Sequence, residues 1–200
     1  MSIIRKVKAV EKIFSRLEAE TNTLKELTGM HCLSGCGKCC MKPDIEASPI
    51  EFLPLAYSWF EEGIAYEKLE ELGSNPPGVC IVFKPVYLSD KSGSCGNYKY
   101  RGLICRLFGY ATSRDKNGLR KLVTCNLIKQ DQPGSYQIAL DLIEQKEYLP
   151  SFINYYQQLS QIDFRLANEM LPINQAIKVA LQEVIKYYSY RPFPKRRKAS

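Results

Sequence analysis

The sequence is poor in several features that would point to a common class of protein. It has one histidine, and no uninterrupted apolar run approaches the roughly 20 residues of a membrane span. The N-terminal stretch MSIIRKVKAVEKIF is charged where a signal peptide needs an apolar centre, and Glu11, Glu18 and Glu20 argue against a transit peptide. No Gly-rich phosphate loop, paired-carboxylate site or Ser/His/Asp arrangement is present, so hydrolase and nucleotide-driven functions lack residues to carry them. We expect a cytoplasmic protein without a membrane span.

The composition is that of a globular chain. With 200 residues, 45% of them hydrophobic, the chain can bury roughly two thirds of its unfolded surface without help from disulfides. We expect a single domain over residues 1–192. Much of the net charge of +7 lies in the last ten residues, RPFPKRRKAS. Residues 193–200 are therefore expected to form a disordered basic tail, and nucleic-acid binding is not expected, since no folded basic face with aromatic residues accompanies the tail.

Cysteine is the residue type that is unusually abundant. Four of the eight cysteines lie in the stretch HCLSGCGKCC, with the spacing C-x3-C-x2-C-C, and the other four stand singly between residues 80 and 125. Thiols stay reduced in the cytoplasm, so an even number of them predicts metal ligands rather than disulfides. The predicted ligands are Cys32, Cys36, Cys39, Cys40, Cys80, Cys95, Cys105 and Cys125.

The spacing favours an iron–sulfur cluster over zinc but leaves both open. Gly35 and Gly37 let the backbone curl around a metal and direct amide hydrogens at the sulfurs. Structural zinc sites usually use two C-x2-C knuckles, and this chain has one strict knuckle, Cys36 with Cys39. Iron–sulfur clusters accept three closely spaced ligands and a distant fourth.

The adjacent residues Cys39 and Cys40 are expected to serve different groups, because neighbouring side chains usually diverge. Cys32, Cys36 and Cys39 would form the early group. Cys40 would then join the later cysteines, namely Cys80, Cys95, Cys105 and Cys125.

The spacing C-x3-C-x2-C is also the fingerprint of radical S-adenosylmethionine enzymes. After this motif, radical S-adenosylmethionine enzymes have repeated strand–helix units that form a partial barrel. Here short Gly- and Pro-rich segments follow, and Lys38 stands where an aromatic residue is expected. This alternative is disfavoured.

Hydrophobic periodicity predicts helices at both ends of the chain. Apolar or small residues recur in steps of three and four over 3–28, and Gly29 is a plausible C-cap. Further helices are predicted at 48–62, where Ser48 and Glu51 form a capping box, at 65–73, and near 135–148, 151–170 and 172–189.

The middle of the chain is expected to be irregular. Between 73 and 126 the apolar pieces VCIVF, LICRLFGY and LRKLVTCNLI predict short strands and turns, with a hairpin turn at 116–118. The predicted fold is mainly α with a small irregular β region: amphipathic helices at both ends surround a cysteine-rich metal-binding core at about 30–126, and a helical part follows at 134–190.

A joint pattern of residues resembles a known family. Its members carry a C-G-x-C-C group followed by an R-x3-C-R element, matched here by Cys36 to Cys40 and by Arg101, Cys105 and Arg106. The pattern is similar to the YkgJ-type cysteine-cluster family, described as zinc- or iron-chelating or as iron–sulfur oxidoreductase-like, over about residues 30–126. Family members usually have prolines where Gly102 and Gly109 stand here. The resemblance implies that the eight cysteines form one metal-binding unit; a more distant resemblance to flagellin lysine methylases has no motif here to support methyl transfer.

Three charged or titratable residues flank the cysteines. Arg101 and Arg106 are predicted cofactor-binding residues, because a nearby guanidinium would stabilise an anionic cluster and raise its potential. His31 beside Cys32 is either a ligand or proton carrier, or a surface or capping residue. The predicted function is a metal-binding protein with an iron–sulfur (4Fe–4S) cluster, serving electron transfer or an oxidoreductase reaction with an unidentified protein partner. The alternative is a non-catalytic zinc protein that binds a partner.

Overall fold

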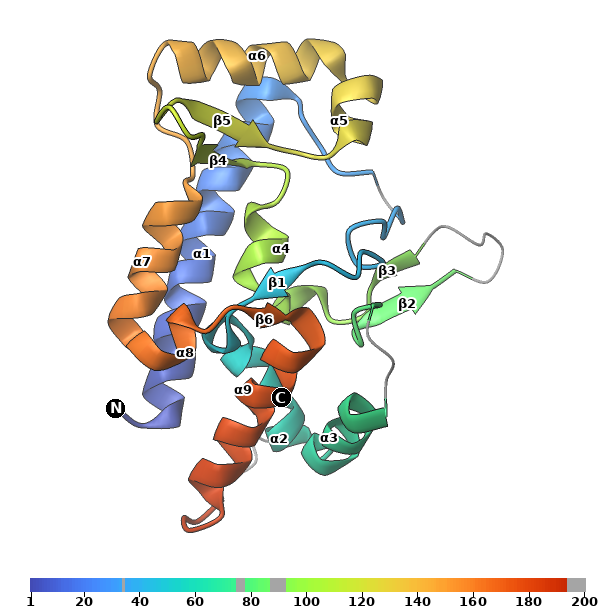
Figure 1. The fold of residues 1–200 in the computed structure, drawn as a ribbon, viewed down its shortest axis with the longest axis vertical. Helices are drawn as coiled ribbons and strands as arrows, with labels where there is room; N and C mark the ends of the chain where they lie inside the picture. Colours follow the sequence, from blue (N-terminus) through green and yellow to red (C-terminus); the bar gives the residue numbers. More distant parts are fainter. Residues whose placement is uncertain (34, 75–77, 87–92, 194–200) are drawn as a thin grey trace.

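The computed structural model describes residues 1–33, 35–74, 78–86 and 93–193 (Figure 1). Its elements in chain order are α1 (Ile3–Thr28), β1 (Glu46–Ala47), η1 (Pro49–Phe52), α2 (Leu53–Glu62), α3 (Ala65–Ser74), β2 (Phe83–Pro85), β3 (Gly93–Cys95), η2 (Tyr98–Tyr100), α4 (Leu103–Leu107), β4 (Ala111–Arg114), β5 (Arg120–Val123), α5 (Asn126–Asp131), α6 (Pro133–Glu144), α7 (Phe152–Ile162), α8 (Phe164–Asn168), β6 (Leu171–Pro172) and α9 (Ile173–Tyr188). The named strands form antiparallel pairs, β1 with β6, β2 with β3 and β4 with β5. The predicted fold class, mainly α with helices at both ends, is confirmed.

The N-terminal helix α1 follows its predicted bounds. The Ser2 hydroxyl accepts a hydrogen bond from the Arg5 N–H at the start, and Gly29 ends the helix in the left-handed region with φ 70°. The buried positions repeat with helical periodicity: Ile3, Val7, Val10, Ile13, Phe14, Leu17, Thr21, Leu24 and Thr28. This stripe faces α2, α4, α6 and α7.

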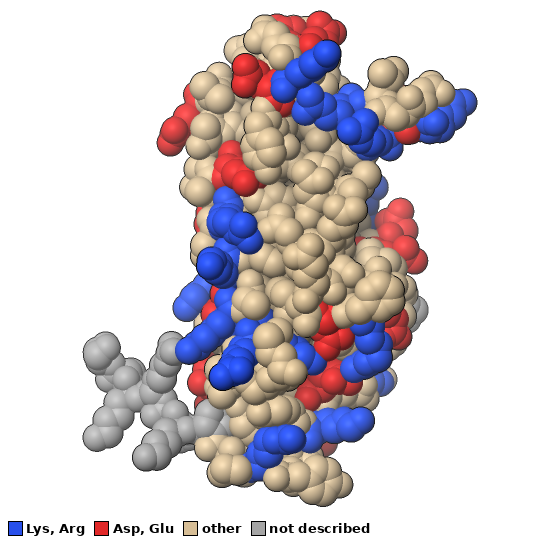
Figure 2. Space-filling view, turned by 90° about the vertical axis from the view of Figure 1, so that its left-hand side faces the viewer, with Lys and Arg blue, Asp and Glu red and all other residues tan. Residues whose placement is uncertain are grey.

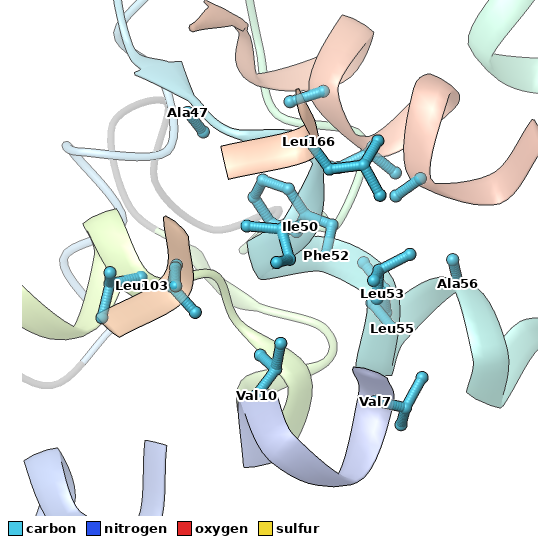
Figure 3. Close-up of a cluster of buried hydrophobic side chains, with 14 of the residues drawn as sticks. Val7, Val10, Ala47, Ile50, Phe52, Leu53, Leu55, Ala56, Leu103 and Leu166 are labelled. Atoms are coloured by element: carbon cyan, nitrogen blue, oxygen red, sulfur yellow. The ribbon is translucent and has the colours of Figure 1, made fainter. Parts of the chain in front are cut away.

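The main core lies where η1 and α2 meet α1, α4, α8 and α9 (Figure 3). The labelled side chains that converge there are Val7, Val10, Ala47, Ile50, Phe52, Leu53, Leu55, Ala56, Leu103 and Leu166. Full burial of one large apolar side chain contributes roughly 1.5–3 kcal/mol. Helices from both ends of the chain thus share one core, and α4, which carries Cys105, is anchored in it through Leu103.

The helix predicted at 48–62 forms with the expected capping box but changes type. Its first turn is the 3₁₀ segment η1, and the Leu53 N–H donates to the Ile50 carbonyl at the junction. The ring of Pro54 has no N–H to give to Ile50, so an α-helical bond is missing at this point. The predicted extent is confirmed, and Pro54 explains the break.

The middle of the chain differs from the prediction in three stretches. The stretch LICRLFGY was expected to be a strand or turn, but Leu103–Leu107 is the helix α4. Glu51 Oε2 accepts the Ile104 N–H at 2.8 Å and so caps this short helix from a distant part of the chain. Similarly, in LRKLVTCNLI the strand β5 ends at Val123 and the helix α5 begins at Asn126. In VCIVF only Phe83 belongs to a strand. The hairpin turn at 116–118 is confirmed between β4 and β5.

The C-terminal helices occur near their predicted places. The segment predicted at 151–170 is broken at Asp163, which accepts the Leu166 N–H at 3.1 Å and caps α8. Asp163 also pairs with Lys6 of α1. Helix α7 packs on α1, and α9 packs on α2 and η1. Within the described ranges, none of the helices combines the length and the apolar character needed to cross a membrane. Of the predicted tail, 194–200 lie outside the described residues.

Candidate metal centre

Backbone hydrogen bonds join the early cysteine segment to the β2–β3 hairpin. The Cys80 N–H donates to the Cys40 carbonyl at 3.0 Å, and the Gly93 N–H donates to the Gly35 carbonyl at 2.8 Å. Within the hairpin Cys95 stands opposite Phe83. Figure 1 shows the segment that follows α1 running beside β3. The topology therefore brings cysteines from residues 32–40 and from residues 80–95 to one side of the molecule.

Gly37 allows the closest approach between these two segments. Its φ is 57°, in the left-handed region, and a Cβ placed there would lie 2.5 Å from Phe83 Cε2 and 2.9 Å from the Gly93 carbonyl oxygen. Only glycine fits this position without displacement. The backbone thus makes a tight cradle at the centre of the C-G-x-C-C group.

Four thiols form what we call the outer group, consisting of Cys32, Cys36, Cys39 and Cys125. The Cys32 N–H donates to Tyr110 Oη at 2.9 Å. Gln132 at the end of α5 bonds both the N–H and the carbonyl of His31, at 2.9 and 2.8 Å, which holds the end of α5 against the residue before Cys32. Cys125 precedes α5, and its Sγ accepts the Ile128 N–H at 3.5 Å. Burial raises the pKa of Cys32, and Cys39, Cys36 and Cys125 raise it further, so these three thiols lie within electrostatic range of Cys32.

The other four thiols form the inner group, consisting of Cys40, Cys80, Cys95 and Cys105. Cys80 is 8% exposed and belongs to the main core, against which Cys40 and Cys105 also pack. Burial raises the pKa of Cys80 to about 11, with smaller contributions from Cys95 and Cys39. Burial likewise raises the pKa of Cys105, followed by the charges of Cys80, Glu51, Cys39 and Cys95.

Asn174 of α9 holds the backbone on both sides of Cys80. Its side-chain oxygen accepts the Ile81 N–H at 2.9 Å, and its side-chain nitrogen donates to the Val79 carbonyl at 2.8 Å. The position of Cys80 is thus set by a helix almost a hundred residues later in the chain.

Cys39 and Cys40 stand at the boundary between the two groups. A hydrogen bond between their side chains lowers the pKa of Cys39 to about 6 and raises the pKa of Cys40. The charge of Cys39 contributes to the raised pKa of Cys32 in the outer group and of Cys80 and Cys105 in the inner group, so Cys39 lies between the two groups. Cys40 faces Cys80 and Cys105, as expected from the sequence. The Cys125 thiol lies within electrostatic range of Cys32, whereas the sequence led us to expect it with the later cysteines.

The donor set fits a thiophilic metal. All eight cysteines are free, and thiolates suit zinc or iron–sulfur clusters rather than calcium or magnesium. In the parts of the chain that the structure describes, no three His, Cys, Asp or Glu side chains already stand in the arrangement that holds an ion. Binding would therefore draw the loops closer, which couples metal uptake to local folding.

The two arginines occupy different environments. The Arg101 guanidinium stacks 4.0 Å from the centre of the Tyr98 ring. Its positive charge partly offsets the rise in the pKa of Cys32 caused by burial, and adds to the lowering of the pKa of Cys39 that the hydrogen bond with Cys40 causes. Arg106 donates instead to the carbonyls of Arg101 and Lys99, at 3.1 and 2.6 Å. It also lies over the Phe14 ring of α1 at 4.6 Å. Arg101 faces the outer group, whereas Arg106 fastens the Arg101 backbone to α1.

Some residues near the cysteines had no recognisable signal in the sequence. Glu51 was identified only as a capping residue, yet it is fully buried and accepts hydrogen bonds from Ser48, Ile104 and Tyr156. Tyr110 and its contact with Cys32 could not be found from spacing. The exposed His31 imidazole bonds the Gly29 carbonyl at 3.1 Å, which is a local contact at the helix end.

The comparisons with known proteins agree with this site. A family model described as "CxxCxxCC: Putative zinc- or iron-chelating domain" matches residues 31–126. Residues 31–126 belong to this family. The CxxCxxCC domain contains all eight cysteines, and metal binding is the function that the family supports. Neither the search of curated proteins nor the search of solved structures found a match.

Proposed function

We propose that the CxxCxxCC domain of this chain holds an iron–sulfur cluster, of the 4Fe–4S type, in an electron-transfer or oxidoreductase function. The observation that supports this proposal is that the Cys125 thiol lies within electrostatic range of Cys32, as do the thiols of Cys36 and Cys39. Three closely spaced thiols with one distant thiol is the ligand plan of many cubane clusters. Cys32 and Cys39 are exposed, which gives an electron partner access to this group.

The inner group supplies a second set of four thiols. Cys40, Cys80, Cys95 and Cys105 are half-buried or buried, and all of them except Cys95 belong to the main core or pack against it. Deprotonating thiols there is unfavourable without a cation, as the raised pKa of Cys80 shows. We propose that these residues are ligands as well, with Arg101 near the outer group and Arg106 acting through the backbone of Arg101.

The alternative function is a zinc-binding protein without catalysis. The observation that favours it is the small size of the strands between the cysteines, since β2 and β3 each contain 3 residues. Such short strands need support, and a metal ion would join the loops. The radical S-adenosylmethionine alternative gains no support, because the named strands pair in antiparallel fashion.

The partner in either case would be a protein. On the face shown in Figure 2, Lys and Arg side chains run down part of the left flank, and Asp and Glu side chains lie above this run and to its right, with uncharged surface between them. We place the protein in the cytoplasm, where its eight free thiols would stay reduced.

Anaerobic purification followed by metal analysis tests the proposal. Iron and acid-labile sulfide in comparable amounts, a brown colour and broad visible absorption are the expected results. A colourless protein with stoichiometric zinc would support the alternative. A protein that retains neither metal, and takes up neither after anaerobic reconstitution, would contradict both.

A further inference from the structure

Aromatic side chains at the end of α9 stack on one another and stay open to solvent on one side. The Phe193 ring lies 5.6 Å from the Phe60 ring of α2, and the Phe60 ring lies 4.7 Å from the ring of Tyr188, with both pairs stacked. Tyr188 is buried, whereas Phe193 is 72% exposed. Tyr190, which stands between them in the sequence, is 90% exposed. Phe193 and Tyr190 therefore offer aromatic surface that no described residue covers.

Arg191 is held next to these residues with its charge at the surface. Its guanidinium lies 4.3 Å from the centre of the Tyr187 ring, and its Nη1 donates to the Tyr187 carbonyl at 3.1 Å. Arg191 is exposed, and none of the ion pairs among the described residues includes it. Figure 1 shows the end of α9 at the lower extremity of the molecule, away from β2 and β3. A cation and exposed rings thus stand together at one end of the protein.

The charged residues from the last turns of α9 to the end of the chain are all basic. Between Val184 and Ser200 the sequence has no Asp or Glu and six basic residues, namely Lys186, Arg191, Lys195, Arg196, Arg197 and Lys198. Residues 195–198 lie outside the described residues, but their charges are present in any conformation. Glu61 of α2 lies within electrostatic range of Tyr188, yet it is half-buried and offsets one of these charges at most. This end of the protein is therefore suited to an anionic partner.

We propose that the end of α9 docks on an anionic lipid surface, with Tyr190 and Phe193 at the level of the headgroups and Arg191 beside their negative charges. Exposed aromatic rings partition into the boundary between headgroups and acyl chains, and clustered Lys and Arg residues are attracted to acidic lipids. Single-stranded nucleic acid also stacks on aromatic rings, but it requires a basic groove that follows its backbone. Here the exposed rings and Arg191 lie within residues 190–193, at the end of one helix. The inference goes beyond the proposed function and does not depend on the metal centre.

Flotation of the full chain, kept reduced, with lipid vesicles tests the inference. We expect binding to vesicles of phosphatidylcholine mixed with phosphatidylserine, weaker binding at high salt, and no binding to vesicles of phosphatidylcholine alone. R191Q removes one charge and should weaken vesicle binding roughly fivefold. F193S removes the exposed ring and should weaken vesicle binding several-fold at low and at high salt.

Two variants elsewhere on the surface are matched controls. F164S removes Phe164 of α8, which is 74% exposed. K129Q removes Lys129 of α5, whose ammonium nitrogen lies 5.6 Å from the centre of the Tyr136 ring, as Arg191 lies over Tyr187. Both variants should bind the vesicles as the unaltered chain does. Circular dichroism melting shows whether each variant is folded.

Absence of binding to the phosphatidylserine vesicles would overturn the inference, and so would equal binding of F193S and F164S. A chain shortened by residues 194–200 provides a further comparison. If this shortening abolishes binding while R191Q and F193S leave it unchanged, the basic tail acts alone and the end of α9 is not the docking surface. Binding to a single-stranded RNA homopolymer without binding to vesicles would assign the surface to nucleic acid and overturn the inference as well.

Discussion

The backbone N–H of Cys80 donates a hydrogen bond to the carbonyl of Cys40 at 3.0 Å. This bond places Cys40 with the inner group, while its neighbour Cys39 also reaches toward Cys32. We predict that Cys39→Ala abolishes metal binding at the outer group. Cys40→Ala should keep that site and reduce only the metal held by the inner group. Metal per chain and the visible or cobalt-substituted spectrum of the two variants measure the difference.

Identical losses in the two variants would mean that the adjacent cysteines serve one centre. The division into outer and inner groups would then be wrong.

Cys125 provides an independent test of the same division. Since it lies with Cys32 and Cys36, Cys125→Ala should give the same metal loss and the same spectrum as Cys32→Ala. Cys95→Ala is the comparison, because it should affect the inner group alone. If the spectrum of Cys125→Ala matches that of Cys95→Ala instead, Cys125 belongs with the inner group.

Gly37 and Gly35 form a matched pair for testing the cradle. Both have positive φ, 57° and 68°, but a Cβ on Gly37 would meet Phe83 at 2.5 Å, whereas a Cβ on Gly35 meets nothing within 4 Å. Gly35→Ala should therefore cost only backbone strain, about 1 kcal/mol. Gly37→Ala should cost a further 1–3 kcal/mol or so and lower metal content. Urea unfolding of the metal-loaded variants measures the costs, and equal costs would show that the loop does not approach the hairpin as described.

The pair between Lys6 and Asp163 makes stability depend on pH. Burial disfavours the Asp163 carboxylate, but the hydrogen bonds from Lys6 and from the Leu166 N–H outweigh it and lower its pKa. A lowered pKa stabilises the fold above the unfolded pKa of about 3.9, and this contribution disappears as pH falls through the folded pKa. Asp163→Asn keeps the helix cap and loses the charge, so we expect a loss of about 1 kcal/mol at pH 7 that vanishes below about pH 3.

Asp163→Ala is the companion variant and removes the cap as well. It should cost about 1 kcal/mol more than Asp163→Asn at every pH. Urea unfolding at several pH values provides both comparisons. A difference between the unaltered chain and Asp163→Asn that does not change with pH would rule out the ion pair as its source.

Removal of metal should loosen the middle of the chain selectively. Strands β2 and β3 contribute no fully buried side chain to the main core, whereas α7 and α9 bury residues there. A strong chelator should therefore expose residues 74–126 to protease while sparing the C-terminal helices. Limited proteolysis with mass spectrometry checks this, and continued protection of 74–126 would show that the cysteines are not its structural centre.

Local sequence signals predicted those parts of the fold that depend on neighbouring residues. The periodicity of α1, its end at Gly29 and the turn at 116–118 all follow from residues within a few positions of one another. Helix α4 could not be predicted from its neighbours in sequence, because Glu51, which caps it, lies 53 residues earlier in the chain. The attachment of the end of α5 to His31 was missed for the same reason, since Gln132 makes these hydrogen bonds across 101 residues. That the eight cysteines are metal ligands remains a prediction from the sequence, and the contacts of Lys25 with Tyr110 and of Tyr110 with Cys32 could not be found from spacing.

The hydrogen bonds of Asn174 with Val79 and Ile81 show that the cysteine-bearing domain depends on residues outside the matched region. The family signature ends at residue 126, yet the backbone around Cys80 is held by α9, and Tyr156 of α7 donates to the Glu51 carboxylate that caps the helix of Cys105. An excised 31–126 fragment would lose these supports together with the Arg106 contact to Phe14 of α1. The flanking helices thus support the backbone around the cysteines. Substitutions in these helices can therefore alter the cysteine geometry while residues 31–126 stay unchanged.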